Sequence, residues 1–293
     1  MDLAARTLQE YSYYLKIERA MSPNTVVSYA SDLKAFFSAV ESNPADVTPE
    51  DIVGYIAGKE NLSKTSQARL LCSLRSFFDW LILEGERKDN PCDQVDSPKI
   101  GRYLPEVLSV DEVAAIMESV DLTGRVGKRD RAILEVLYGC GLRVSEATGL
   151  KISNVYFDEG FVRVVGKGDK ERIVPLGEMA KDAVQGYLPV RPEVSSPKYD
   201  DILFLNRFGS PLSRISVFNM VKRQAMLAGI RKEISPHTFR HSFATHLIEN
   251  GADLRVVQEM LGHENILTTE IYTHIDSSTW QRAILEHHPR GGK

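Results

Sequence analysis

Three histidines and an arginine lie within ten positions in the stretch SPHTFRHSFATHLIENG, residues 235–251. Ser235 is a typical helix N-cap and Pro236 fits the first helical position, so the stretch predicts a helix that begins here. His237 then lies in the first turn, where free backbone N–H groups and the helix dipole favour an anion. Arg240 follows three positions later on the same face, so the pair could bind a phosphate.

A metal site is the alternative for this helix, because His237 and His241 are four positions apart. A zinc protease would carry glutamate directly after the first histidine, and this chain has Thr238 there. No cysteine lies nearby to add a ligand. We therefore predict no metal site here, and we expect His241 and His246 to be partly buried scaffold residues that form hydrogen bonds.

Three other segments place reactive side chains next to glycine turns. GCGLRVSEATGL puts Arg143 at a predicted helix start, and VVGKGDKERIVP puts Lys167 in a predicted hairpin turn. LGHENILTTEIYTHID puts His263 directly after a helix stop, with Tyr272 nine residues later. A phosphate site on the histidine helix becomes a strong hypothesis only if these segments meet it in space.

The order of these motifs resembles that of the tyrosine recombinases, a phage-integrase-like family, and of their Xer branch in particular. The motifs are, in order, G-L-R-x-S-E, G-K-G-x-K-x-R, H-x-x-R-H-x-F-A-T-H and L-G-H, with a tyrosine nine residues after the last histidine. The resemblance covers nearly the whole chain. It implies that a tyrosine attacks a DNA phosphate and leaves a 3′-phosphotyrosine and a free 5′-hydroxyl. Because the covalent link preserves the bond energy, it implies neither ATP nor another cofactor, and the chain has no P-loop motif.

The resemblance also implies a role for each matching residue. Tyr272 would be the nucleophile, and the guanidinium groups of Arg143 and Arg240 would hold the phosphate oxygens and stabilise charge that grows in the transition state. Lys167 would be the general acid that protonates the departing 5′-oxygen. Lys170, in the same loop, is the rival for that role.

The remaining members of the set are two histidines and a glutamate. His237 would accept or relay the proton of the nucleophile, and His263 would donate a hydrogen bond to a phosphate oxygen. Glu146 lies three residues after Arg143 and could orient its guanidinium. The alternative for Glu146 is a charge on the helix surface.

The composition is typical of a soluble globular protein, with 43% hydrophobic and 26% charged residues among 293. No stretch has the length of a spanning helix or a signal-peptide core, and three scattered cysteines argue against a disulfide framework, so we expect a cytoplasmic protein and no membrane partner. The net charge of −4 argues weakly against a nucleic-acid binder, but local patches decide binding.

Two domains are expected from the length and from a segment rich in proline, glycine and charge. We predict an N-terminal helical DNA-binding domain over 1–88, a linker over 89–106 and a catalytic domain over 107–293. The fold class is mainly α (α+β), with four N-terminal helices and a mostly helical C-terminal domain that contains a small antiparallel sheet. The sheet is predicted as a hairpin over 161–176, followed by a loop to Tyr199.

The four N-terminal helices are predicted from apolar spacing and from cap-plus-proline signals. The last of them carries Thr65, Arg69 and Ser76 away from its apolar face, where they either meet solvent or contact DNA. The four predicted ranges are 3–18, 22–40, 48–56 and 63–85.

The resemblance implies double-stranded DNA as the partner and a homo- or hetero-tetramer on DNA, with a paralogous Xer recombinase and a septal DNA translocase as further partners in resolving chromosome dimers. The tail carries an apolar stripe of Trp280, Ala283 and Ile284, which we expect to dock into a neighbouring protomer; packing on its own domain is the alternative. Other functions compatible with the residues are a mobile-element integrase or transposase, a type IB topoisomerase-like enzyme and a non-catalytic DNA-binding protein.

Overall fold

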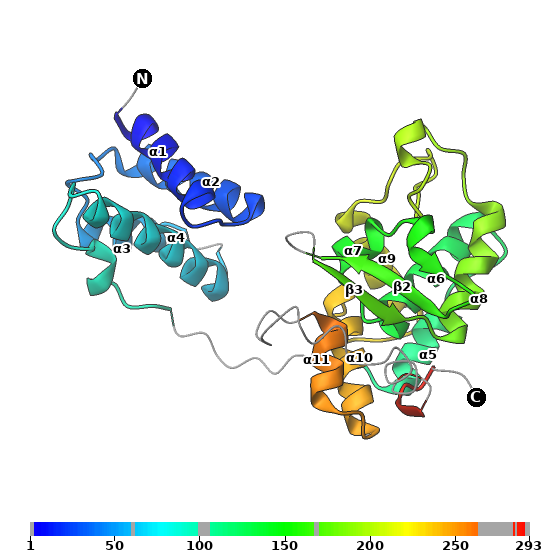
Figure 1. Ribbon diagram of the computed structural model, residues 1–293. Helices are drawn as coiled ribbons and strands as arrows, with labels where there is room; N and C mark the ends of the chain where they lie inside the picture. The colour runs from blue at the N-terminus through cyan, green and yellow to red at the C-terminus, as the bar shows by residue number, and fades with distance from the viewer. Residues whose placement is uncertain are drawn as a thin grey trace. The chain divides into compact units, whose positions relative to one another are not determined.

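The chain divides into two compact units, Met1–Tyr103 and Leu104–Lys293, in the computed structural model (Figure 1). The structure describes residues 3–59, 62–98, 106–166, 170–262, 284 and 286–290. Among these residues, no helix combines the length and the apolar character needed to cross a membrane. The limits of the linker stay a prediction, because residues 99–105 lie outside the described part.

The N-terminal unit is a helical bundle built around aromatic side chains. Phe36, Phe77 and Phe78 are completely buried, and Phe77 meets Phe78 edge to face. Burying one such side chain contributes about 1.5–3 kcal/mol, so this core holds the unit together. The described elements are α1 (Leu3–Ile17), α2 (Pro23–Val40), α3 (Pro49–Ala57), α4 (Lys64–Leu83) and the short 3-10 helix η1 (Pro91–Gln94), close to the predicted ranges.

The described part of the C-terminal unit is mainly helical with a small sheet, so the predicted fold class is confirmed. Its three antiparallel strands have the order β1-β2-β3, and Val162 faces Val174 across the last pair. The described elements are α5 (Val110–Glu118), α6 (Arg125–Gly139), α7 (Val144–Thr148), η2 (Ile152–Asn154), β1 (Val155–Tyr156), β2 (Phe161–Val165), β3 (Glu171–Pro175), α8 (Glu178–Tyr187), η4 (Leu188–Val190), η5 (Pro197–Tyr199), α9 (Arg214–Leu227), α10 (Pro236–Glu249) and α11 (Leu254–Leu261).

The prediction of a loop between the hairpin and Tyr199 was wrong, because helix α8 lies in this segment. The helix buries Ala180, Val184 and Tyr187, which are spaced by four and three residues, and it packs against α6 (Figure 1). The prolines and serines that suggested a loop begin only where α8 ends. The two-residue strand β1 was also not predicted.

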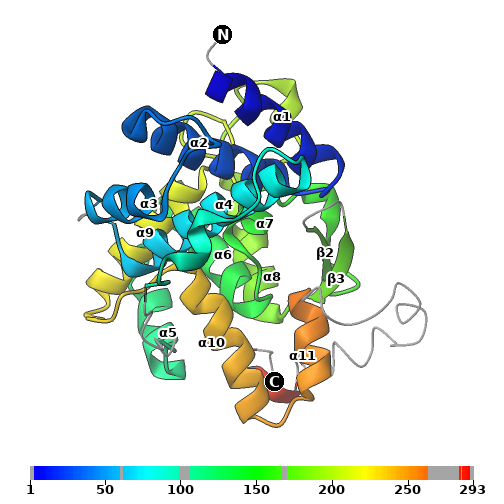
Figure 2. The ribbon, with the colours of Figure 1, turned by 90° about the vertical axis from the view of Figure 1, so that its left-hand side faces the viewer.

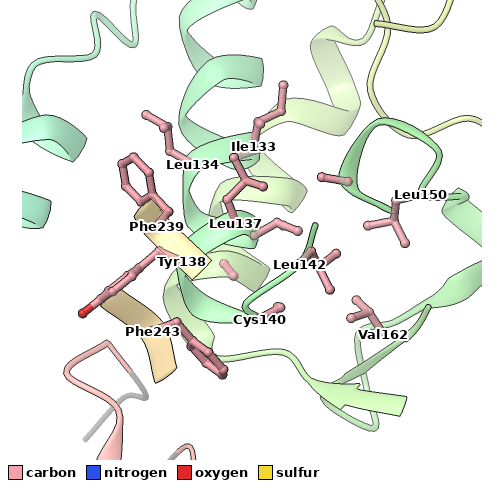
Figure 3. Packing of buried hydrophobic residues seen from close by; sticks show 14 of the residues in the cluster. Ile133, Leu134, Leu137, Tyr138, Cys140, Leu142, Leu150, Val162, Phe239 and Phe243 are labelled. Carbon is pink, nitrogen blue, oxygen red and sulfur yellow. The ribbon is translucent and has the colours of Figure 1, made fainter. Parts of the chain in front are cut away.

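Helix α6 lies at the centre of the C-terminal core and packs against α10 (Figure 3). Leu137 and Tyr138 of α6 are completely buried, as are Phe239 and Phe243 of α10. The turn after α6 passes so close to α10 that a Cβ atom on Gly141 would lie 2.5 Å from Phe243 Cδ1. Gly141 also has a φ of +59°, which favours glycine. This turn sets where the chain enters α7.

Replacing Gly141 by alanine should lower the free energy of unfolding by about 2–4 kcal/mol, because it adds left-handed backbone strain to an overpacked contact. The measurement is urea denaturation of the full chain. Gly186→Ala is the matched control: it lies in α8 with open space around its missing Cβ, so it should be neutral or stabilising. A Gly141→Ala protein as stable as the parent would contradict this account of the turn.

Candidate active site

Arg143 begins helix α7, directly after the Gly141 turn, and its backbone takes the extended N-cap conformation. Its backbone N–H donates to Glu146 Oε2 at 2.7 Å, and its Nη1 donates to Glu146 Oε1 at 2.9 Å. Its side chain is 39% exposed. The guanidinium is therefore oriented by the protein and still reachable by an anion from solvent.

Glu146 is a buried carboxylate on which arginines from three different segments converge. Arg172 of β3 donates from Nη1 to Oε1 and from Nη2 to Oε2, both at 2.8 Å, and Arg240 Nη1 lies 4.0 Å from Oε2. Burial alone would raise the pKa of Glu146, but the hydrogen bonds from Arg172 and Arg143 lower it to about 2. The carboxylate therefore stays ionised at any physiological pH.

Arg240 lies in the second turn of α10 and its side chain is only 10% exposed. Its Nη1 donates to the Gly141 carbonyl at 2.7 Å, and its Nη2 donates to the Leu261 carbonyl. Burial, and then the nearby charge of Arg143, lower the pKa of Arg240 to about 10. It remains a cation at neutral pH, held rigidly beside Arg143.

The C-terminal end of α11 is the second acceptor group for these arginines. Its successive carbonyls Met260, Leu261 and Gly262 accept from Arg172 Nε at 2.8 Å, from Arg240 Nη2 and from Arg143 Nη2 at 3.2 Å. Carbonyls at a helix C-terminus lack intrahelical partners and carry the negative end of the helix dipole, so cations are favoured there. The end of α11 lies beside β3 in both views (Figures 1 and 2).

Two glycines, Gly166 and Gly262, lie next to the cluster, and each directly precedes a predicted site residue in the sequence. A Cβ on Gly166 would lie 3.9 Å from Glu146 Oε1, and one on Gly262 would lie 3.2 Å from Arg172 Cδ. The neighbours that follow them, Lys167 and His263, lie outside the described residues, as does Tyr272.

The cluster carries an excess of positive charge, since three arginines share one glutamate. This holds although the whole chain has a net charge of −4. His237 is exposed in the first turn of α10, and the capping box of Ser235 with Thr238 begins that helix as predicted. Such a site suits an anion with more than one negative charge, such as the transition state of a substitution at a phosphate.

Arg172 is the member of the cluster that sequence reasoning missed. Strand β3 buries Arg172 and Val174 and exposes Glu171 and Ile173, so the arginine occupies a core-facing position. Two signals were available: Arg172 is the last residue of the motif G-K-G-x-K-x-R, and an arginine at an inward strand position requires partners.

The other histidines of α10 lie in different surroundings. His246 is buried and shares a 2.8 Å hydrogen bond between its Nδ1 and Tyr138 Oη, so its predicted scaffold role is confirmed. His241 is exposed, so the expectation that it is partly buried was wrong: its position on α10 points away from the core. No group of three or more potential metal ligands occurs within the described ranges.

The three N-terminal candidates for DNA contact differ in their surroundings. Thr65 is exposed, and Arg69 is exposed but donates from Nη2 to Asp32 at 2.9 Å. Ser76 is half-buried and accepts a 2.8 Å hydrogen bond from Tyr11 Oη. Two of the three therefore present side chains to solvent, and Ser76 takes part in the packing of its own unit.

The described part of the tail, Ile284 and residues 286–290, packs on its own domain, and docking of the tail into a neighbouring protomer stays a prediction. Ile284 is 1% exposed within the C-terminal core, and Arg290 Nε donates to the buried Glu135 at 2.9 Å. His288 lies 4.7 Å, ring to ring, from Tyr138. A single chain can therefore bury Ile284 and pair Arg290 with Glu135 without a second protomer. Trp280 and Ala283 lie outside the described residues.

Comparisons with known proteins agree with the motifs. The model of the Phage integrase family matches residues 106–279, and that of the Phage integrase N-terminal SAM-like domain matches 8–85. Tyrosine recombinase XerD of Chlorobaculum tepidum is 45% identical over 98% of this chain and 97% of its own length. XerD of Staphylococcus aureus is 43% identical, over 97% and 98%.

Solved structures give the same result. The XerA recombinase crystal structure is 33% identical, with a TM-score of 0.51 over 98% of this chain and 99% of its own. Lambda integrase (residues 75–356) bound to DNA is 19% identical, with a TM-score of 0.72 over 90% of this chain and 92% of its own, which shows the fold alone. The resemblance predicted from the motifs is confirmed.

Replacing Glu146 by glutamine should destabilise the C-terminal domain at neutral pH and less so in acid. The folded pKa of about 2 lies below the ordinary 4.5, so the carboxylate's stabilisation is complete above pH 4.5 and is lost as the pH falls toward 2. The shift corresponds to about 3 kcal/mol. Urea denaturation at several pH values measures the gap; Glu118→Gln, at the exposed end of α5, is the control and should show no such trend. A gap for Glu146→Gln that stays constant with pH would contradict the prediction.

Proposed function

Because the chain belongs to the phage integrase family of tyrosine recombinases, we propose that it cleaves and rejoins DNA at specific sites through a 3′-phosphotyrosine intermediate. The observation that carries the proposal is the convergence of Arg143 and Arg240 on one carboxylate and one helix end. These residues come from separate helices, and they form a rigid cationic site that fits a phosphodiester.

The reaction requires a negatively charged phosphorus centre to accept a nucleophile, so negative charge grows on its non-bridging oxygens. Arg143 can bind those oxygens from its exposed side, and Arg240 adds its charge from a fixed position. Because both guanidinium groups are oriented before DNA arrives, little reorganisation is needed in the transition state. A single arginine in this role contributes about 10³–10⁵ in rate.

The remaining steps are assigned to the other residues of the motifs. The phenol oxygen of Tyr272 forms a bond to phosphorus as the bond to the 5′-oxygen breaks. A phenol has a pKa of about 10, so it must lose its proton during attack, and His237 accepts or relays that proton. Lys167 protonates the 5′-oxygen, and His263 donates to a phosphate oxygen. Attack by another 5′-hydroxyl reverses the sequence and reseals DNA.

The finer proposal concerns the biological event. We propose that the chain resolves chromosome dimers at cell division, in the cytoplasm, as a tetramer on double-stranded DNA; its similarity to the XerD tyrosine recombinases supports this role. A paralogous recombinase and a septal DNA translocase are the partners we propose. In the N-terminal unit, the exposed Thr65 and Arg69 are stronger candidates for DNA contact than Ser76, which already bonds Tyr11.

A covalent-adduct assay tests the chemistry. With a suicide substrate nicked beside the cleavage position, the parent chain should trap a protein–DNA adduct, and Tyr272→Phe should trap none. Arg240→Met should cleave at least about 10³-fold more slowly. Tyr199→Phe, a half-buried tyrosine outside the cluster, is the matched control and should cleave normally. An adduct formed by Tyr272→Phe would contradict the assignment of the nucleophile.

Mapping the DNA bound by the chain in cells tests the biological role. Because chromosome dimers are resolved where replication ends, we expect one dominant locus near the replication terminus. Binding at the ends of a mobile element would contradict dimer resolution and favour the integrase alternative, with the chemistry unchanged.

A further inference from the structure

Arg172 is almost completely enclosed, with its side chain 5% exposed. All three of its nitrogens donate: Nη1 and Nη2 bind the two oxygens of Glu146, and Nε binds the Met260 carbonyl, each at 2.8 Å. A buried guanidinium of this kind is retained only when its donors are satisfied. The side chain is too deep to bind DNA itself, so any effect on the reaction must pass through its partners.

The partners of Arg172 belong to the segments that carry the proposed chemistry. Glu146 also holds Arg143, and Met260 lies in the last turn of α11. A Cβ on Gly166 would lie 3.8 Å from Arg172 Nη1, and one on Gly262 would lie 3.4 Å from its Nε. The backbone preceding Lys167 and the backbone preceding His263 therefore both lie against this one side chain.

We propose that Arg172 is a positioning residue for strand cleavage: it fixes the β2–β3 hairpin, Glu146 and the end of α11 as one unit around the phosphate site. This inference rests on the proposed recombinase function. Without Arg172, Glu146 would keep only the donors of Arg143 as close partners and would neutralise more of the charge that Arg143 offers the phosphate. The cluster would lose one of its three positive charges as well as its geometry.

Lysine cannot replace Arg172 in this arrangement. An ammonium group is a compact charge, whereas the guanidinium presents two parallel donors to the carboxylate and a third, sideways donor to the Met260 carbonyl. If the charge of Arg172 were all that mattered, lysine would restore activity. The geometry predicts that it does not.

Single-turnover cleavage of a suicide substrate at saturating DNA, with Arg172→Met and Arg172→Lys, tests the proposal. Both should cleave about 10- to 100-fold more slowly than the parent, because supporting residues of this kind contribute about that much. DNA affinity should change little, since Arg172 does not reach solvent. Arg163→Met is the matched control: it lies on the neighbouring strand, is bound to Asn154 and is 42% exposed, so it should cleave at the parent rate. Circular dichroism and thermal denaturation establish that each variant is folded.

A methylphosphonate at the scissile position separates positioning from a purely structural loss. This substrate lacks one charged non-bridging oxygen, so its transition state needs less positive charge from Arg143. The deficit of the Arg172 variants should therefore be smaller on methylphosphonate than on phosphate, whereas a smaller fraction of correctly folded protein would slow both equally.

Three results would overturn the role of Arg172: a variant that cleaves at the parent rate, full recovery in Arg172→Lys, or an equal deficit on both substrates. If Arg172→Met does not fold, Arg172→Lys, which retains the charge, carries the same comparison. Failure of the parent chain to form any adduct would instead count against the proposed recombinase function.

Discussion

The carboxylate of Glu146 and the carbonyl end of α11 are the constraint on which the C-terminal unit's cationic site depends. Arg143, Arg172 and Arg240 would repel one another if they were simply placed together in a protein interior. Each instead donates to one of three consecutive helix-end carbonyls, and two of them also bind the carboxylate. These acceptors neutralise only part of the charge, so the site remains cationic.

An incompletely neutralised cluster is a natural place for a substrate anion to contribute stability. A protein that binds a ligand only in its folded state is stabilised by that ligand. A DNA phosphate at Arg143 would supply the negative charge that the cluster lacks, because the side chain of Arg143 is partly open to solvent. The same excess charge that costs stability in the free chain would thus stabilise a phosphate, and still more its transition state.

The docked tail illustrates how a contact surface can be satisfied within one chain. Glu135 is buried and accepts from Arg131 on its own helix and from Arg290 in the tail. The apolar stripe in the sequence indicates that the tail needs an apolar partner surface, and it does not specify which copy of the chain supplies that surface. Hydrophobic burial is non-directional, so the same stripe suits either arrangement.

The starts of several helices follow from the residue pattern alone, because an N-cap and its partner lie only three residues apart. The caps at Ser22, Thr48 and Ser235 each form as the sequence predicts. The ordered motifs likewise determined the family and the proposed reacting residues. Helix α8 was not predicted, because the prolines that follow it dominate the composition of the segment. Composition averaged over a segment hides a short amphipathic helix. The role of Arg172 in the site became visible only in the folded domain, because its partners Glu146 and Met260 lie 26 and 88 positions away along the chain. Local spacing carries no information about such contacts; they exist only once the strand, the helix start and the helix end have packed together.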